Sequence, residues 1–487
     1  MVDQKKSNSE EEKFDQFKKL QELLAQLTTE QYESLKRKHA EYMNKKDPDE
    51  PAKSMEEFLF WKTQPVPSFD GKVPNAEKPK FGAIEHKKVS EVSTTPVNLS
   101  ENIDGFEWSD LNINNESELN EIHTLLNENY IEDLSSTMRF AYSKEFLRWA
   151  MSLPGTDPSW LVGIRVKASR KLVAFISAVP IQLGIQNPGM DEDKVDKVKS
   201  VEINFLCVHK KLRSKRLAPI LIKEITRRVN LTDIWQALYT AGIVLPRPIS
   251  TCRYTHRPLN WSKLYDVGFV DLPEGIKESQ MQEKYHVKKV TEKKDSSLVP
   301  FEPKYYDEVS VLFKAQQKRY KLQHLINSKE EFLHQFSPRK DVLKSFVYLN
   351  DEGKVTDFIS YYILPFNILG ESEVDVVETL KVAYLYHYCS DCADTLDNDR
   401  SLTARLNEII QDMLGDALYN EKCDLFNCLT SQDNNLFIEK QNFGMGSGFL
   451  HFYLFNYYTE KMNGGIEKIS KDNWKLQDKS DIGVVMI

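Results

Sequence analysis

A cluster of cationic residues follows an apolar segment in the first half of the chain. Residues 201–209 have the pattern of a strand, residues 210–216 read KKLRSKR, and the helical spacing of apolar residues begins at Leu217. A strand that leads through a cationic loop into a helix places free backbone amides, the helix dipole and Lys/Arg charges around one point. This arrangement favours an anion and predicts a phosphate site. The alternative is a solvated charged surface, which is the more common role of such a run.

The residues around the cations indicate which kind of phosphate loop this is. The loop of the nucleoside triphosphatases is excluded, because the chain has no Gly-x-x-x-x-Gly-Lys-Ser/Thr. Residues 213–218 are similar to Arg-x-x-Gly-x-Ala, the pyrophosphate signature of the GNAT acyl-CoA transferases, with Arg216 in place of Gly. Pro219 follows in the first helical turn, where its missing N–H costs little. The residues expected around the phosphates are Lys211, Leu212, Arg213, Ser214, Lys215, Arg216, Leu217, Ala218 and Pro219.

Other candidate chemical groups have simpler interpretations. Cys389 and Cys392 form a lone C-x-x-C pair without a second pair at zinc spacing, so we expect two free thiols and no metal site. No Ser–His–Asp set stands out, so a covalent acyl-enzyme is not indicated. The chain ends in apolar residues 484–487, which by themselves predict an ordinary last strand with a solvent-facing end.

The elements that must position the cationic loop follow one another in a regular order. Strand patterns at 161–166, 171–180 and 201–209 precede an apolar helical stripe over 217–229, and a further strand pattern follows at 237–245. Alternating strands and helices of this kind predict a mixed α/β sheet.

The same order returns in the second half of the chain. The tripeptide FIS of 175–177 recurs at 358–360, and it is followed by a strand pattern at 384–390, a helical stripe over 406–414 and a strand pattern at 424–430. We therefore predict two fused copies of one α/β unit, with coincidence as the alternative. The loop of the second copy, 390–399, is acidic and would repel a phosphate. Only the first copy is expected to bind a phosphorylated cofactor.

Composition limits the classes of protein to be considered. The 487 residues carry 65 Lys and Arg against 73 Asp and Glu, a net charge of −8, which argues against nucleic-acid specificity. A hydrophobic content of 40% supplies a core, and six cysteines are too few for a disulfide scaffold. No apolar run reaches the ~18 residues of a membrane span, and the charged first residues do not form a secretory signal. We expect a cytoplasmic enzyme that acts as a monomer.

The N-terminal residues differ from the rest of the chain in composition. Residues 1–57 are dense in both charges and carry one narrow apolar stripe, which predicts a helical extension. This helix is either a solvated flank of the fold or a docking element, for example for the ribosome. Residues 58–103 are rich in proline and read as a linker. They begin with the aromatic cluster Phe58, Leu59, Phe60 and Trp61.

At residues 202–210 the sequence EINFLCVHK resembles the first signature of the fungal and other eukaryotic glycylpeptide N-tetradecanoyltransferases, usually called N-myristoyltransferases. Further stretches that resemble this family are 60–66, 127–130, 238–246, 251–261 and 483–487, and the similarity covers roughly 55–487. The resemblance implies two GNAT-like units in tandem, related by pseudo-two-fold symmetry. Residues 104–295 would bind the acyl-CoA, and residues 296–487 would bind the peptide and supply the C-terminal carboxylate.

The resemblance also implies a reaction and its residues. A tetradecanoyl (myristoyl) group would move from myristoyl-CoA to the amine of an N-terminal glycine of a peptide or nascent protein, without a metal. Backbone N–H groups of Phe205 and Leu206, freed by a strand bulge, would stabilise the thioester oxygen. The terminal carboxylate of Ile487 would accept the amine proton, with Asn204 and Thr240 holding the amine. Cofactor contacts would include Phe58, Leu59, Phe60, Trp61, Ile203, Asn204 and Phe205, and peptide contacts Tyr130, Glu132, Asp133, Phe140, Tyr142, Tyr254 and His256.

Two positions depart from the family pattern. The second signature of the family is usually Lys-Phe-Gly-x-Gly-Asp-Gly, whereas this chain has Ser447 in place of Asp, and Ser135 stands near a further missing acid. Both acids belong, by resemblance, to the groove for a basic peptide residue, so the peptide preference is open. The alternatives to the N-myristoyltransferase are a related acyl-CoA N-acyltransferase with another acyl length, and a non-catalytic scaffold that binds acyl-CoA and peptide.

Overall fold

The protein is described from a computed structural model. The described residues are 54–74, 79–99, 105–130, 138–191, 194–289, 298–369, 376–394, 398–470 and 473–487. The predicted helical extension therefore lies almost wholly outside the described residues, and so do Glu132, Asp133 and Ser135.

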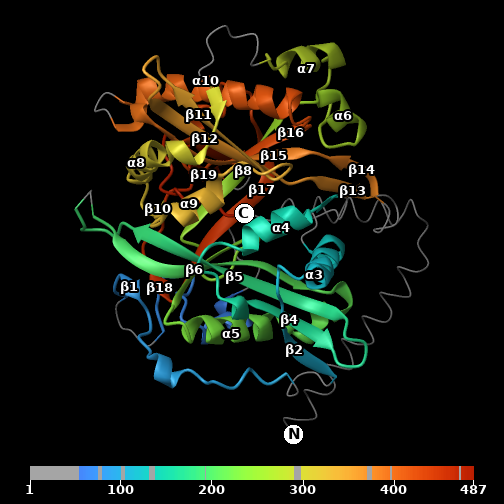
Figure 1. The fold of residues 1–487 in the computed structure, drawn as a ribbon, viewed down its shortest axis with the longest axis vertical. Coiled ribbons are helices and arrows are strands. Elements are labelled where there is room, and N and C mark those ends of the chain that lie inside the picture. Colours follow the sequence, from blue (N-terminus) through green and yellow to red (C-terminus); the bar gives the residue numbers. More distant parts are fainter. Residues whose placement is uncertain are drawn as a thin grey trace.

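A 13-stranded mixed sheet runs through the molecule and confirms the predicted α/β class (Figure 1). Its spatial order is β2 (Phe106–Asp110), β4 (Leu161–Val166), β5 (Leu172–Ile185), β6 (Asp196–Val208), β7 (Gln236–Ala241), β17 (Gly444–Phe455), β8 (Ser250–Pro258), β16 (Leu425–Leu429), β15 (Val382–Ser390), β12 (Val355–Ile363), β11 (Leu343–Leu349) and β9 (Leu298–Pro300), and β10 (Leu322–His324) pairs with β5. The smaller sheets are β1 (Gly82–Ala83) with β18 (Tyr457–Tyr458), β14 (Val376–Leu380) with β13 (Phe366–Leu369) and β3 (Met138–Phe140), and β19 (Ile466–Ser470) with β20 (Asn473–Leu476).

Helices cover this sheet. They are α3 (Glu116–Asn129), α4 (Lys144–Met151), α5 (Leu217–Asn230), α6 (Trp261–Asp266), α7 (Glu278–Lys284), α8 (Tyr306–Gln317), α9 (Lys329–Phe336) and α10 (Asn398–Tyr419). In Figure 1, α5 lies below the strands of the first half, and α10 lies across the top of the second half. Each of the two helices packs on strands of its own half. Leu221 of α5 lies in one core cluster with Val162 and Ile176, and Ile410 of α10 lies in another with Ile359 and Phe426.

The strand order confirms the predicted repeat. β6 runs antiparallel to β5 and parallel to β7, and α5 connects β6 to β7. In the second half, β15 runs antiparallel to β12 and parallel to β16, and α10 connects them. The two halves therefore use one topology, as the recurring tripeptide and strand–helix–strand order indicate.

The two units exchange one strand each, which the sequence analysis did not predict. β17 from the second half lies between β7 and β8, while β8 from the first half pairs with β16. The strand predicted over 237–245 ends at Ala241, and the N–H of Leu245 donates to the hydroxyl of Tyr453 at 2.8 Å instead of to a strand partner. The exchange joins both halves into one continuous sheet.

The C-terminal tail ends at the centre of the molecule, where Figure 1 marks it between the two halves. Gly483 allows its entry, because a Cβ there would lie 2.3 Å from the ring of Tyr320. Val484 and Met486 belong to one core cluster, while Val485 belongs to another. The apolar tail by itself predicts an ordinary last strand with a solvent-facing end. This prediction is wrong, because the last residues lie between two cores.

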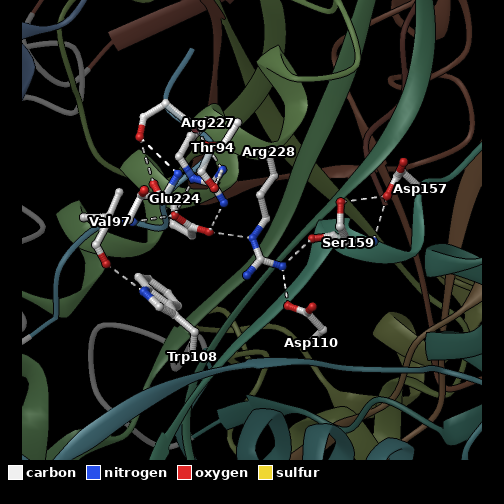
Figure 2. A network of polar contacts seen from close by, with 11 residues as sticks. Thr94, Val97, Trp108, Asp110, Asp157, Ser159, Glu224, Arg227 and Arg228 are labelled. Carbon is white, nitrogen blue, oxygen red and sulfur yellow. Dashed lines mark hydrogen bonds and ion pairs between the residues drawn. The ribbon is translucent and has the colours of Figure 1, made fainter.

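A buried ionic network fixes α5, the helix that begins at the cationic loop (Figure 2). The carboxylate of Glu224 is fully buried and accepts hydrogen bonds from Arg227 at 2.7 and 2.9 Å, from Arg228 at 2.7 Å and from the N–H of Val97 at 2.9 Å. Arg228 also pairs with Asp110 on β2. The network therefore joins α5 to the edge of the sheet and to the segment before it.

Glu224→Gln is expected to lower the free energy of unfolding by about 3–5 kcal/mol, because it removes the buried carboxylate that two largely buried guanidinium groups share, and of its ion pairs Arg228 then keeps only that with the exposed Asp110. Asp110→Asn is the matched control. It removes an acid that is 68% exposed and should cost less than about 1 kcal/mol. Urea unfolding at pH 7 measures both, and equal losses would contradict the role of the buried carboxylate.

The same network predicts a pH dependence. Burial by itself would raise the pKa of Glu224, but the hydrogen bonds from Arg227, Val97 and Arg228 outweigh burial and hold this pKa below its ordinary value. A lowered folded-state pKa means that the stabilisation is present above the unfolded pKa near ~4.3 and is lost as the pH falls through the folded value. The difference in stability between wild type and Glu224→Gln should therefore shrink in acid.

Candidate active site

A cavity of about 410 Å³ opens where β6 and β7 separate. The two strands pair only from Ser200 to Glu202 on β6, so they diverge beyond this point. The wall between the strands and α5 is mostly apolar, with Val201, Ile203, Ile222, Ile225, Val229 and Ala237, and its polar members are Thr226, Asn230 and Gln236. Such a wall suits a hydrocarbon chain, which has no polar group to satisfy.

Trp61 closes this cavity from the side of the N-terminal segment. Its ring stacks on Tyr239 at 5.4 Å between centroids, and Tyr239 stacks on Tyr453 at 5.0 Å. Phe60 packs edge-on against Trp61 at 5.1 Å, and Phe58 contacts Phe69. Leu59, the fourth member of the predicted aromatic cluster, is 58% exposed. Of these four residues, Trp61 is the one that lines the cavity.

Asn204 is the centre of the polar contacts in the cavity. Its Nδ2 donates to the terminal oxygen of Ile487. Its Oδ1 accepts from the N–H of Phe205 at 2.8 Å and from the hydroxyl of Tyr130 at 3.4 Å. Thr240, Phe205, Leu206 and Ile487 line the same cavity. The structure therefore brings together all five positions predicted for catalysis.

The backbone at Phe205 and Leu206 forms the bulge that the sequence analysis expected. Ser177 on β5 pairs with Asn204 and Phe175 pairs with Cys207, so Phe205 and Leu206 together oppose Ile176. Phe205 has a φ of 53°, a left-handed conformation that is costly for a residue other than glycine. The amide of Phe205 leaves the regular ladder and turns to the side chain of Asn204.

The cationic loop forms a short 3-10 helix, Lys210–Lys215, directly before α5. Arg216 joins the two with a φ of 55°, in the left-handed region that favours glycine. This conformation explains why the similar GNAT signature has Gly at this position. Lys211 and Lys215 are exposed, and no side chain caps the N-terminus of α5 at Arg216. Cations and helix amides are thus available to an anion at one place.

Buried Asn129, at the end of α3, holds the loop in position. Its Oδ1 accepts the N–H of Lys210 at 3.0 Å, and its carbonyl accepts from Arg213 at 2.7 Å. One predicted phosphate ligand, Arg213, therefore also has a structural partner. Leu217 is buried in the core under α5, and Leu212 packs against the same cluster.

Five of the predicted peptide-binding residues lie in the described part of the chain, and they divide into two groups. Tyr130, Phe140, Tyr142 and Tyr254 line the cavity, and burial raises the pKa of Tyr254 to about 12, so its hydroxyl stays neutral. His256 is not among the lining residues of this cavity. Its Nδ1 lies 2.8 Å from Oδ1 of Asn427, and burial lowers its pKa.

Two residues near the site were missed by the sequence analysis as functional candidates. Asn129 anchors the cationic loop, and Glu202 contacts the tail. Burial raises the pKa of Glu202 to about 7, although hydrogen bonds from the backbone of Ile487 and from Asn204 oppose this shift. Both residues stand in stretches that resemble the family, but their role depends on contacts across the fold that spacing does not encode.

Comparisons with known proteins identify the family. The model described as "Myristoyl-CoA:protein N-myristoyltransferase, N-terminal domain" matches residues 83–252, and the model of the corresponding C-terminal domain matches residues 266–485. The chain belongs to the N-myristoyltransferase family. The two family domains follow each other in tandem, in agreement with the repeat seen in the sheet.

Individual relatives in this family cover nearly the whole chain. A glycylpeptide N-tetradecanoyltransferase of Kluyveromyces lactis is 46% identical over 89% of this chain and 93% of its own length. That of Saccharomyces cerevisiae is 45% identical over 90% and 94%, respectively. The crystal structure of the Saccharomyces cerevisiae N-myristoyltransferase with bound myristoyl-CoA matches with a TM-score of 0.80 and 45% identity, over 89% of this chain and 100% of that chain.

The described residue ranges contain no group of three or more His, Cys, Asp or Glu side chains placed to hold a metal ion. No helix within them is long and apolar enough to cross a membrane.

Proposed function

We propose that this protein transfers a tetradecanoyl group from its CoA thioester to the α-amine of an N-terminal glycine. The observation that carries this proposal is the position of the chain terminus. Its carboxylate lies in the cavity on the side-chain amide of Asn204, beside the bulge at Phe205 and Leu206. A carboxylate that ends a buried tail inside an apolar cavity has a chemical rather than a packing role.

Acyl-CoA binding is supported by two features of the first unit. The apolar wall between β6, β7 and α5 fits the acyl chain, with Ile203 on the wall and Trp61 closing over it. The cations of the loop 211–216 and the free amides at the start of α5 fit the phosphates. The predicted contacts of Ala218 and Pro219 follow from their place in this first turn.

In the reaction that we propose, the amine nitrogen attacks the thioester carbon, and the carbonyl oxygen gains negative charge. The N–H groups of Phe205 and Leu206, which lie at the bulge, stabilise that oxygen, and the N–H of Phe205 gives up its hydrogen bond to Oδ1 of Asn204 to do so. The C–S bond then breaks, and the CoA sulfur leaves with a proton as the thiol. Side chains at these two positions serve packing, since the donors belong to the backbone.

The terminal carboxylate of Ile487 accepts a proton from the glycyl ammonium. In water, an amine of pKa ~8 and a terminal carboxyl of pKa ~3.5 differ by about four units in the wrong direction. Burial works against both charges, because it raises the pKa of the acid and lowers that of the amine by up to several units each. Asn204 and Thr240 line the space where the amine would be held.

Mass spectrometry of a Gly-initiated peptide mixed with acyl-CoAs of increasing chain length tests this function. We expect one acyl group on the glycine amine and the highest rate with tetradecanoyl-CoA. A maximum at another chain length would favour the related N-acyltransferase. Binding of acyl-CoA and peptide without any product would favour the scaffold.

Peptide preference is the property that Ser447 should change. Ser447 lies in the irregular stretch of β17 between Met445 and Phe449, and the Nε of Arg253 donates to the neighbouring carbonyl of Gly446 at 2.7 Å. With a cation here and the acid of the family pattern absent, we predict a weak preference for Lys over a neutral residue several places after the glycine.

Ser447→Asp should raise the ratio of kcat/KM between a Lys-containing and a neutral peptide by about 1.5- to 5-fold, which is the effect of an exposed ion pair. Ser447→Asn is the control of similar size without charge, and it should leave the ratio unchanged. A strong Lys preference in the wild type that neither variant alters would refute this prediction.

Other assignments stay predictions. These are the contacts of Glu132, Asp133 and His256 with the peptide, the monomeric state, the cytoplasmic location and a ribosome contact of residues 1–57. The boundaries at 57, 103 and 295 also stay predictions.

A further inference from the structure

Glu202 lies directly behind the terminal carboxylate. It is the last residue of β6 that pairs with β7, at the fork where the cavity begins. Its carboxyl accepts the backbone N–H of Ile487 and lies 3.5 Å from Nδ2 of Asn204. The same Nδ2 donates to the terminal oxygen of Ile487. One amide group therefore contacts both carboxyl groups.

Two cavities meet at the terminus. Ile487 lines both the large cavity and a small one behind it, whereas Glu202 lines only the small one. The small cavity leaves about 30 Å³ for the centres of water molecules, enough for one or two of them. Glu202 therefore faces away from the substrate and reaches it only through the terminus.

We propose that Glu202 is a positioning residue, which fixes the last residue of the chain and, as a second carboxylate beside it, increases the affinity of the terminal carboxylate for the amine proton. This inference rests on the proposed role of the terminus as base. Two carboxyl groups that both contact Nδ2 of Asn204 disfavour double ionisation and behave as one coupled pair. When Glu202 is ionised, its charge makes the terminal carboxylate a stronger base.

The groups that face Glu202 leave this coupling undiminished. Tyr362 on β12 and Tyr386 on β15 interact with Glu202, and burial raises the pKa of both hydroxyls, so they stay neutral. His324 and His334 line the small cavity, and burial lowers the pKa of both, to about 4 for His324. At pH 7 these four groups carry no charge that would screen the pair.

The protons balance in this scheme. One N–H bond of the ammonium breaks, and an O–H bond forms on the terminal carboxylate. The second proton released on amide formation leaves with the CoA thiol. The shared proton then passes from the carboxyl pair to water in the small cavity, which resets the site.

Glu202→Gln tests the inference, because it keeps an oxygen that accepts the N–H of Ile487 but removes the charge. Burial raises the pKa of Glu202 to about 7, so wild type and variant should react at similar rates at pH 6, where Glu202 is mostly protonated. At pH 8 the variant should be about tenfold slower in single turnover, since a coupling of one pKa unit is tenfold in proton affinity. Affinity for tetradecanoyl-CoA should be unchanged.

Two further variants complete the test. Glu202→Asp retains the charge and should restore the rise in rate between pH 6 and 8. Glu331→Gln removes a half-buried carboxyl whose pKa is also raised by burial, which accepts the N–H of Asn327 and does not line either cavity, and it should have no pH-dependent effect.

A loss in Glu202→Gln that is equal at every pH would indicate a merely structural role and overturn the inference, as would a wild-type rate at pH 8. Deletion of Ile487 separates this from the proposed function. If the deletion is slow and Glu202→Gln is not, only the inference fails. If the deletion itself has no effect, the assignment of the base fails.

Discussion

Deletion of Ile487 is expected to slow acyl transfer by about 10²–10⁴-fold at pH 7, the usual effect of losing a general base. The deletion leaves a carboxylate on Met486, but that group is displaced by one residue from the amide of Asn204. Proton transfer requires hydrogen-bond distance, so a displaced base loses most of its effect. Single-turnover mixing of a preformed tetradecanoyl-CoA complex with peptide measures this step.

The pH dependence and a control variant distinguish a lost base from a damaged site. The rate deficit should shrink above pH ~8, where the peptide amine is already neutral in solution. Ile487→Leu keeps the carboxylate and a similar side chain, and it should be nearly silent. Affinity for tetradecanoyl-CoA should persist in the deletion, because the cationic loop is in the first unit. Near-normal turnover of the deletion at pH 7 would refute the assignment.

Replacing Lys211 and Lys215 together with Glu is expected to weaken tetradecanoyl-CoA binding by about 10²–10⁴-fold, since each charged hydrogen bond contributes about 1.5–3 kcal/mol. Both side chains are exposed, and the substitution leaves the hydrogen bond from Arg213 to Asn129 in place. Acids near the start of α5 also suit its dipole, so the fold should be retained. Calorimetric titration at several salt concentrations measures the change.

The matched control reverses two other exposed lysines, Lys314 and Lys354, which lie in the second half of the chain. It has the same net charge as the loop variant and should bind tetradecanoyl-CoA like the wild type. Salt should weaken binding by the wild type more than by the loop variant. Equal affinities of wild type and loop variant would place the phosphates elsewhere.

Local pattern predicts the repeated unit well but not how the two units join. The hairpin at β4 and β5, the strand β6 and the stripe of α5 are visible as apolar periodicity, and so are their counterparts in the second half. β8 is not visible in this way, because its sequence STCRYTHRP carries polar residues on both faces. Its exchange with β17 depends on pairing between segments about 200 residues apart, which periodicity does not describe.

The candidate site also has a part that the sequence predicts and a part that only the fold shows. The cationic loop and the bulge near Phe205 lie in one continuous stretch, where residue types and family resemblance are informative. The contact of Asn204 with Ile487 joins residues 283 positions apart, and only the folded chain shows that it exists. Glu202 also could not be assigned from the sequence. Its raised pKa results from burial, and its contact with the tail forms only in the folded chain.

The most direct test of the central claim changes only the terminal group. Joining a synthetic C-terminal segment to the rest of the chain by protein ligation gives a full-length enzyme that ends in a carboxamide at Ile487. The carboxamide keeps the size and the neighbours of the carboxylate but cannot accept the amine proton. At pH 7 we predict a single-turnover rate about 10²–10⁴-fold lower than that of the ligated carboxylate, with equal affinity for tetradecanoyl-CoA. Equal rates for the carboxamide and the carboxylate would contradict the account.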